Sequence, residues 1–182
     1  MATHPAVLGR FFEDYVVGDV YQHPLGRTIT ETDNTWITLL SMNTNQNHFN
    51  AHLAAQNPIT EGRVIVNSGF TVAVVLGISV LDMSQNAISN LAFTDIKMSH
   101  PVYEGDTIYA ESICTGLRKS ESRPYAGIVS MITRGLNQDG VEVISWKRSV
   151  MVATRESGIG QNYFPAAQNG PLQLPEEKGA TA

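Results

Sequence analysis

The longest apolar-rich stretch of the chain, residues 62–81, reads GRVIVNSGFTVAVVLGISVL. Its β-branched residues favour a strand, but a strand of a globular protein usually has only about five or six residues. No firm turn signal divides the stretch, and apolar or small residues recur at helical spacing, at Val66, Phe70, Val74 and Gly77. Its length therefore predicts one long buried helix.

The chain after residue 87 is typical of β-structure. Four strand-like runs are expected at residues 88–98, 107–117, 126–136 and 141–152. The last two runs are joined by Asn137-Gln138-Asp139-Gly140, a good hairpin turn with glycine last. In the last run Arg148 falls in the same alternating row as Trp146 and Val150, so one face of this strand is partly charged.

The first part of the chain predicts short helices. Thr30 and Thr32 are candidate N-caps for a helix at about residues 32–41, and a second short helix is expected at residues 51–56. Helices followed by a run of antiparallel strands predict a single α+β domain, which we place at residues 11–154. Residues 155–182 are rich in glycine and proline, and we expect a partly disordered extension or one that packs on a neighbouring subunit.

The composition excludes several function classes. A net charge of −5 over 182 residues argues against nucleic acid as a partner. The single cysteine, Cys114, excludes an internal disulfide framework and suits a reducing cytoplasm, with a buried thiol expected. No signal peptide is expected at the N-terminus. The most apolar part, residues 70–80, is well short of the ~18 residues of a transmembrane helix, so we expect no membrane span.

Residues 41–52, SMNTNQNHFNAH, concentrate asparagine and histidine without any charged side chain of the Asp, Glu, Lys or Arg type. A neutral imidazole such as that of His48 can take a proton from water and return it. Asn43 and Asn45 carry amides that can orient this water or the ring. The alternative interpretation is a polar loop with a surface histidine. His48 and His52 have i,i+4 spacing, but no third ligand follows, so we expect no metal.

Two further groups of residues are candidates for binding. A helix that begins near Asn67-Ser68-Gly69 would present free backbone N–H groups to a developing oxyanion, although a polar break in a core segment fits equally well. Ser68 lacks the G-x-S-x-G elbow of a serine nucleophile. A cationic cluster can bind phosphates or simply be a solvated strand end; its members are Arg118, Lys119 and Arg123.

Together these motifs resemble the MaoC-like dehydratases of the hot-dog fold, which include the (R)-specific enoyl-CoA hydratases. The family signature runs S/T-G-D-x-N-P-x-H, and here Asn45 and His48 match it in SMNTNQNHFN. Asn43 stands in place of the usual catalytic aspartate, Gln46 in place of proline and Asn50 where aspartate is frequent. The stretch PVYEGDTIYAES, residues 101–112, matches the family pattern P-V-x-x-G-D-T-L.

The resemblance implies a long helix wrapped by an antiparallel sheet, a homodimer or an assembly of dimers, and no cofactor. It implies an acyl-CoA substrate, with addition of water to an α,β-unsaturated thioester. His48 would act as the general base, Asn43 would orient water, Asn45 would contact substrate, and the Asn67-Ser68-Gly69 segment would hold the enolate oxygen. The sequence is also similar to the branch that acts on mesaconyl- or itaconyl-CoA, for which Arg63 is a candidate partner of a second carboxylate.

Two rival functions stay open at this point. An acyl-CoA thioesterase on the same fold would need a carboxylate to activate water, and Asp33, Glu61 or Asp95 are candidates. A domain that binds acyl-CoA without turnover is the non-enzymatic alternative, because Asn43 cannot accept a proton as aspartate does. Release of free thiol distinguishes the thioesterase, and tight binding that is insensitive to His48→Ala distinguishes the binding domain.

Overall fold

A computed structural model describes residues 9–160 and 164–173. One antiparallel sheet has the strand order β1-β4-β5-β6-β3, and the short β2 pairs with the outer side of β4. The strands are β1 (Val20–Gln22), β2 (Arg27–Thr28), β3 (Ala87–Met98), β4 (Thr107–Lys119), β5 (Ala126–Leu136) and β6 (Glu142–Ala153). The four strand-like runs of the sequence are therefore confirmed, each within a few residues.

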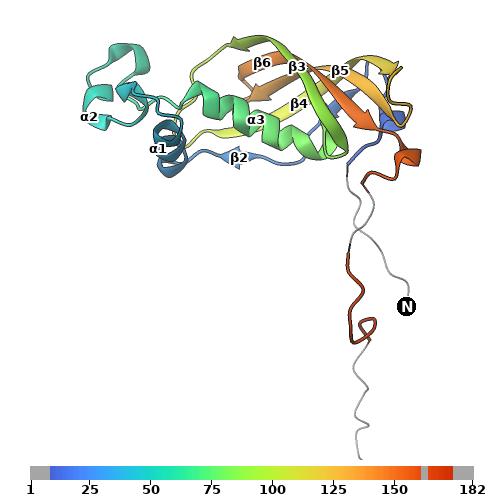
Figure 1. Ribbon diagram of the computed structural model, residues 1–182. Helices are drawn as coiled ribbons and strands as arrows, with labels where there is room; N and C mark the ends of the chain where they lie inside the picture. Colours follow the sequence, from blue (N-terminus) through green and yellow to red (C-terminus); the bar gives the residue numbers. More distant parts are fainter. Residues whose placement is uncertain (1–8, 161–163, 174–182) are drawn as a thin grey trace, which may run out of the picture.

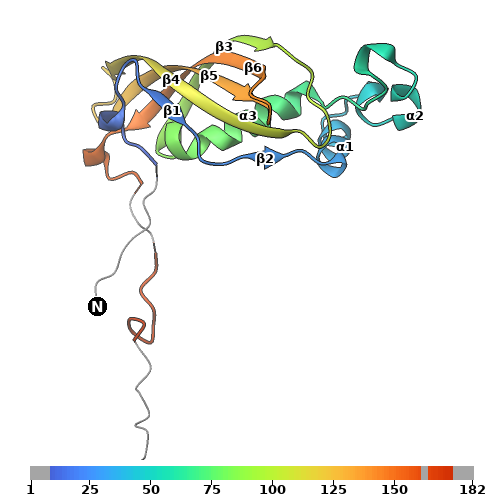
Figure 2. The same ribbon diagram turned by 180° about the vertical axis from the view of Figure 1, so that it is seen from behind.

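The long helix α3 (Ser68–Met83) lies along one face of this sheet. Figure 1 shows α3 crossing the strands, and Figure 2 shows the sheet from the other side. The helix predicted for the apolar stretch is confirmed, and it begins at Ser68, within the Asn67-Ser68-Gly69 segment where the sequence indicated a helix start. The reason is the Asn67 side chain, which accepts a hydrogen bond from the Gly69 N–H at 2.9 Å and so caps the helix there.

The core lies between α3 and the sheet. The helix buries one face at helical spacing, including Thr71, Val75 and Ile78. Against it pack the inward residues of the strands, among them Ile108 and Trp146, which have exposed fractions of 0% and 1%. Trp146 also makes an edge-to-face contact with Phe93. Cys114 is buried in a neighbouring cluster, as expected, and burial raises the pKa of its thiol.

The shorter helices gather beyond the N-terminal end of α3. They are α1 (Glu31–Leu40) and α2 (Ala51–Ala54), with 3-10 turns η2 (Gln46–His48) and η3 (Pro58–Thr60) around α2. Two more 3-10 turns, η1 (Phe12–Asp14) and η4 (Arg155–Ser157), flank the sheet strands in sequence. A reciprocal capping box between Thr30 and Asp33 starts α1, in agreement with the predicted N-cap.

The turns follow the sequence signals. The Asn137 side chain accepts hydrogen bonds from the backbone N–H groups of Asp139 and Val141, and Gly140 has a φ of +77°, so the hairpin between β5 and β6 is confirmed. No helix within residues 9–160 or 164–173 is long and apolar enough to cross a bilayer. The expectation of a loose C-terminal extension falls in part on residues 161–163 and 174–182, which lie outside the described residues, and it stays a prediction.

Candidate active site

The loop that carries His48 is fixed by a side chain that the sequence analysis did not single out. Asn34, on α1, is fully buried, and its amide nitrogen donates to the carbonyl oxygens of His48 at 2.9 Å and of Ile65 at 3.3 Å. Its amide oxygen accepts from the backbone N–H of Asn67 at 2.9 Å. One side chain therefore joins the His48 loop to the start of α3.

The tautomer of His48 follows from its own contact. Nδ1 of the half-buried ring lies 2.9 Å from the carbonyl oxygen of Ile65. A carbonyl oxygen only accepts hydrogen bonds, so Nδ1 carries the proton and the lone pair of the neutral ring is on Nε2. Within the described part of the chain Nε2 has no hydrogen-bond partner. It is therefore available to accept a proton from a bound molecule.

The asparagines around His48 mostly shape the backbone. Asn43 Oδ1 accepts from the N–H of Asn45 at 2.9 Å, and Asn45 Oδ1 accepts from the N–H of Asn47 at 3.1 Å. Asn50 caps α2 in the same way, through a 3.1 Å bond from Leu53. Short amide side chains favour such turns because they imitate a backbone turn. The asparagine-rich composition is thus largely structural. Within the described residues, the amide nitrogens of Asn43, Asn45 and Asn47 remain as donors for a ligand.

The start of α3 offers fewer oxyanion donors than the sequence indicated. The N–H of Gly69 is already bound to the side chain of Asn67, and the amide nitrogen of Asn67 donates to Thr38 Oγ1 at 3.2 Å. Both the N–H and the side chain of Asn67 are therefore occupied. The N–H of Ser68, at the first helical position, has no acceptor among residues 9–160 and 164–173. Ser68 is the donor that the geometry leaves free.

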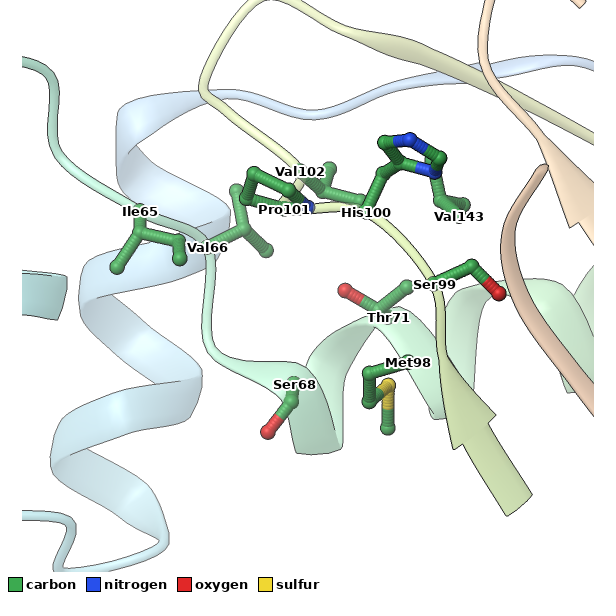
Figure 3. Close-up of a pocket in the computed structure, with 10 residues that line it drawn as sticks. All are labelled: Ile65, Val66, Ser68, Thr71, Met98, Ser99, His100, Pro101, Val102 and Val143. Atoms are coloured by element: carbon green, nitrogen blue, oxygen red, sulfur yellow. The ribbon is translucent and has the colours of Figure 1, made fainter. Parts of the chain in front are cut away.

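A pocket of about 240 Å³ opens beside this helix start. Figure 3 shows Ser68 and Thr71 on α3, facing residues from the end of β3 and the connection to β4, among them Met98 and His100. Ile65, whose carbonyl holds the His48 ring, forms part of the same wall. The pocket therefore lies directly behind the segment that orients His48 and next to the free N–H of Ser68.

His100 and Glu104 are two site residues that the sequence analysis missed. His100 Nδ1 is 2.9 Å from the carbonyl oxygen of Glu142, which leaves its Nε2 as the basic nitrogen of a neutral ring. Glu104 Oε1 accepts from the amide of Asn34 at 3.1 Å. His100 precedes the motif PVYEGDTIYAES and Glu104 is inside it, so position near a family motif was the signal that could have found them.

Arg63 is engaged within its own loop. Its guanidinium carbon lies 3.5 Å from the centre of the Tyr103 ring, and Nη2 is 3.3 Å from the exposed carboxylate of Glu61. About half of its side chain is exposed, so this surface pair is weak and exchangeable. The proposed role of Arg63 toward a second carboxylate stays a prediction.

The cationic cluster is far from His48 within one subunit. Thr107, at the start of β4, pairs with Thr28 close to α1, whereas Arg118 and Lys119 are at the other end of this strand. A strand rises about 3.3 Å per residue, which separates the two ends by roughly 40 Å. Arg123 Nη1 contacts the sulfur of Met151 at 3.2 Å. These cations could therefore bind the phosphates of a CoA whose thioester lies at the His48 of another subunit, but not of one at the His48 of their own. Their phosphate role stays a prediction.

The carboxylates considered for a thioesterase are occupied elsewhere. Asp33 closes the capping box of α1 and binds Arg27 at 2.6 Å. Asp95 pairs with Lys147 at 2.8 Å on the exposed part of β3, and its hydrogen bond to Lys147 lowers the pKa of the carboxyl. Glu61 pairs with Arg63.

The i,i+4 histidine pair does not share one helix face. His48 and His52 lie on separate elements, η2 and α2, since Asn50 starts a new helix between them. The described residues contain no group of three His, Cys, Asp or Glu side chains that could hold a metal.

A central helix packed on an antiparallel sheet in this strand order defines a hot-dog domain. A conserved protein from Mycobacterium tuberculosis with a double hot-dog fold superimposes with a TM-score of 0.73 at 20% identity, over 90% of this chain and 48% of that one. A MaoC domain protein dehydratase from Chloroflexus aurantiacus has a TM-score of 0.73 at 30% identity, over 92% of this chain and 45% of its own.

Sequence comparison then gives the family. Residues 3–168 match the sequence model described as mesaconyl-CoA hydratase, and the chain belongs to this family. The mesaconyl-CoA hydratase of Cereibacter sphaeroides is 34% identical over 154 residues, which are 82% of this chain and 43% of that protein. The chain thus spans less than half the length of this relative.

Proposed function

We propose that this protein reversibly hydrates a branched α,β-unsaturated acyl-CoA thioester, with mesaconyl-CoA as the first candidate substrate. The observation that carries the proposal is the His48 ring, whose Nδ1–H is fixed on the Ile65 carbonyl and whose Nε2 is free. The family, to which residues 3–168 belong, supports the choice of substrate.

The chemistry uses three of the groups that the structure leaves available. Nε2 of His48 takes a proton from water as the water oxygen forms a bond to Cβ of the thioester. Negative charge moves to the thioester oxygen, where the free N–H of Ser68 at the positive end of α3 stabilises it. The proton then passes from His48 to Cα, so that one water is added and the base is regenerated. The amide nitrogen of Asn43 donates a hydrogen bond that orients the water or the substrate.

A second hot-dog unit completes the assembly in this proposal, and we expect it to be a second copy of the chain. β3 is an edge of the sheet, and its exposed side chains include Leu91, Ile96 and Met98, which are 46–48% exposed. A long apolar edge strand is a surface that proteins normally cover. The neighbour with a double hot-dog fold, of which this chain covers 48%, shows that two such units can form one structure. Light scattering at several concentrations measures the expected dimer.

Hydration of a small panel tests the activity: mesaconyl-, itaconyl- and crotonyl-CoA, followed by loss of enoyl-thioester absorbance. We expect turnover of mesaconyl-CoA by the wild type, loss with His48→Ala, and activity retained with Asn43→Asp, since aspartate occupies this position in the resembling family. Thiol release without hydration would instead establish a thioesterase. Binding of CoA esters with no reaction at all would establish a non-catalytic domain.

A further inference from the structure

A buried arginine lies under α3, far from the His48 loop. Arg148, on β6, has an exposed fraction of 3%, and its side chain packs against the Phe93 ring with 5.2 Å from the guanidinium carbon to the ring centre. Its Nε donates to Asn90 Oδ1 at 2.9 Å, and Nη2 contacts the same oxygen. Nη1 is buried and has no hydrogen-bond partner among the described residues.

No anion in the described part of the chain balances this cation. Within residues 9–160 and 164–173, no carboxylate oxygen lies within 4.0 Å of the Arg148 guanidinium. Burial lowers the pKa of Arg148 to about 10, so the group is still charged at neutral pH. A buried charge without a partner is costly, and proteins normally pair such charges. An arginine in this position is therefore suited to an anion that arrives from outside.

The arginine lines a pocket that has room for a small ligand. This Arg148 pocket, about 270 Å³, lies between the C-terminal half of α3 and the start of β3. Its wall includes the apolar Leu76 and Val80 and the hydroxyl side chains of Ser84 and Ser89. A short carbon chain that ends in a carboxylate matches this mixture of apolar wall and cationic end, because guanidinium and carboxylate form charge-assisted hydrogen bonds.

The Arg148 pocket is not part of the His48 site of its own subunit. From Ser68 to Val80 the helix rises about 18 Å at 1.5 Å per residue. A two-fold pairing of two β3 edges is antiparallel, so the start of one β3 would lie beside the end of the other. In such a dimer the Arg148 pocket of one subunit approaches Met98 and Ser99 of the other, which line the pocket beside Ser68.

We propose that the Arg148 pocket binds an organic carboxylate through Nη1. Two sources supply this chemistry: the free carboxylate of a dicarboxylyl-CoA held mainly by the second subunit, and a free organic acid. The first source rests on the function and the dimer proposed above. The second needs neither, because it requires only the pocket of one subunit.

A binding experiment tests the site without any turnover. Mesaconate, at millimolar concentration and against sodium chloride of equal ionic strength, should raise the melting temperature of the wild type. Arg148→Met should abolish this rise, and Arg134→Met should retain it, since Arg134 is half exposed on β5 and pairs with Glu111. Asn90→Asp is the second variant: it places a carboxylate against the guanidinium with little change in shape, and should abolish the mesaconate effect while the protein stays folded.

A kinetic experiment then separates the two sources. If the carboxylate belongs to the substrate, Arg148→Met and Asn90→Asp should raise the KM for mesaconyl-CoA roughly tenfold or more and leave crotonyl-CoA, which has no free carboxylate, within about twofold. If it belongs to a free acid, both esters should be unaffected in the variants. Arg63→Ala, measured in parallel, tests the rival assignment of the substrate carboxylate.

The outcomes are distinct. Loss of the mesaconate effect in both variants supports the site, whichever source the kinetics select. A wild type whose melting temperature responds no more to mesaconate than to chloride, together with equal changes for both esters, would overturn it. If the wild type hydrates no CoA ester, the proposed function fails, but the melting experiment still decides whether the Arg148 pocket binds a carboxylate.

Discussion

His23 and His48 lie near opposite ends of α3, and they differ in the hydrogen bonds that their rings make. His23 lies in a row of hydrogen bonds: Nδ1 is 3.0 Å from Asp82 Oδ2, Nε2 is 3.0 Å from Ser112 Oγ, and Ser112 is 2.8 Å from Thr133 Oγ1. This order of aspartate, histidine and serine matches that of a hydrolase triad. His48 has no such neighbours, only a carbonyl oxygen at Nδ1.

Burial decides between them. His23, Ser112 and Thr133 have exposed fractions of 6%, 1% and 0%, and both ring nitrogens of His23 are bound. Their groups are buried and hydrogen-bonded to one another, so the network joins α3 to the sheet and leaves no ring nitrogen of His23 free for chemistry. His48 is half-buried and keeps one nitrogen free. The free ring nitrogen of His48, and not a hydrolase-like set of neighbours, is the observation on which its proposed role as general base rests.

The largest expected effect is at the half-buried ring of His48. His48→Ala should lower kcat/KM for mesaconyl-CoA by roughly 10²–10⁴-fold, the range for loss of a general acid–base. The free energy of unfolding should change little, because the ring makes a single hydrogen bond. Steady-state kinetics and urea unfolding of the same preparation measure both. Activity that survives in a folded His48→Ala protein would remove the distinction between the two histidines.

The buried ring should show the reverse pattern. His23→Ala removes one hydrogen-bond partner from Asp82, which keeps Arg10, and one from Ser112, which keeps Thr133. It should lower the free energy of unfolding by about 2–3 kcal/mol. The kcat of the protein that remains folded should be unchanged. Urea unfolding and active-site-normalised kinetics test this, and a folded His23→Ala protein without activity would mean that the network takes part in the reaction.

The pH dependence of stability sharpens the comparison further. Burial lowers the pKa of His23 below its ordinary value of 6.5, against the opposing effect of Asp82. Between the folded and unfolded pKa values the unfolded chain binds more protons. The contribution of neutral His23 to the free energy of unfolding is therefore fully present above about pH 6.5. It should decrease as the pH falls toward the folded pKa of His23. Unfolding free energies between pH 7.5 and pH 5 should show a smaller slope for His23→Gln than for His48→Gln.

The smallest effect is expected from the asparagine turns. Asn45→Ala removes the cap of η2 and should cost about 1 kcal/mol, a typical value for a lost N-cap. Asn57→Ala, which removes the corresponding cap of η3, is the matched control away from the signature. Similar losses of stability with a larger loss of activity for Asn45→Ala would show that its amide nitrogen also serves the substrate. Equal effects on activity would leave Asn45 a structural residue.

Much of the fold could be predicted because its signals are local. Apolar periodicity over residues 62–81 indicated α3, alternation indicated the four long strands, and Asn137 with Gly140 indicated the hairpin. The β-branched residues before α3 continue the apolar pattern, and the polar break at Asn67-Ser68-Gly69 indicated where the helix begins. The cap at Asn67 decides the boundary, and its partners Thr38 and Asn34 lie far away in sequence.

The sequence by itself determined the family signature, the position of His48 and the α+β order of elements, because each depends on residues that are close together in the chain. Only the tertiary structure decided which polar groups remain free. Asn34 reaches Asn67 across 33 residues, and His23 reaches Ser112 across 89 residues. Arg148 appears in the sequence as one charged residue in an apolar row. Its Nη1 is buried without a partner among the described residues because α3 and β3 pack over it. Long-range packing excludes water from polar groups. It thereby decides which of them have a hydrogen-bond partner within the protein and which are free to bind a ligand.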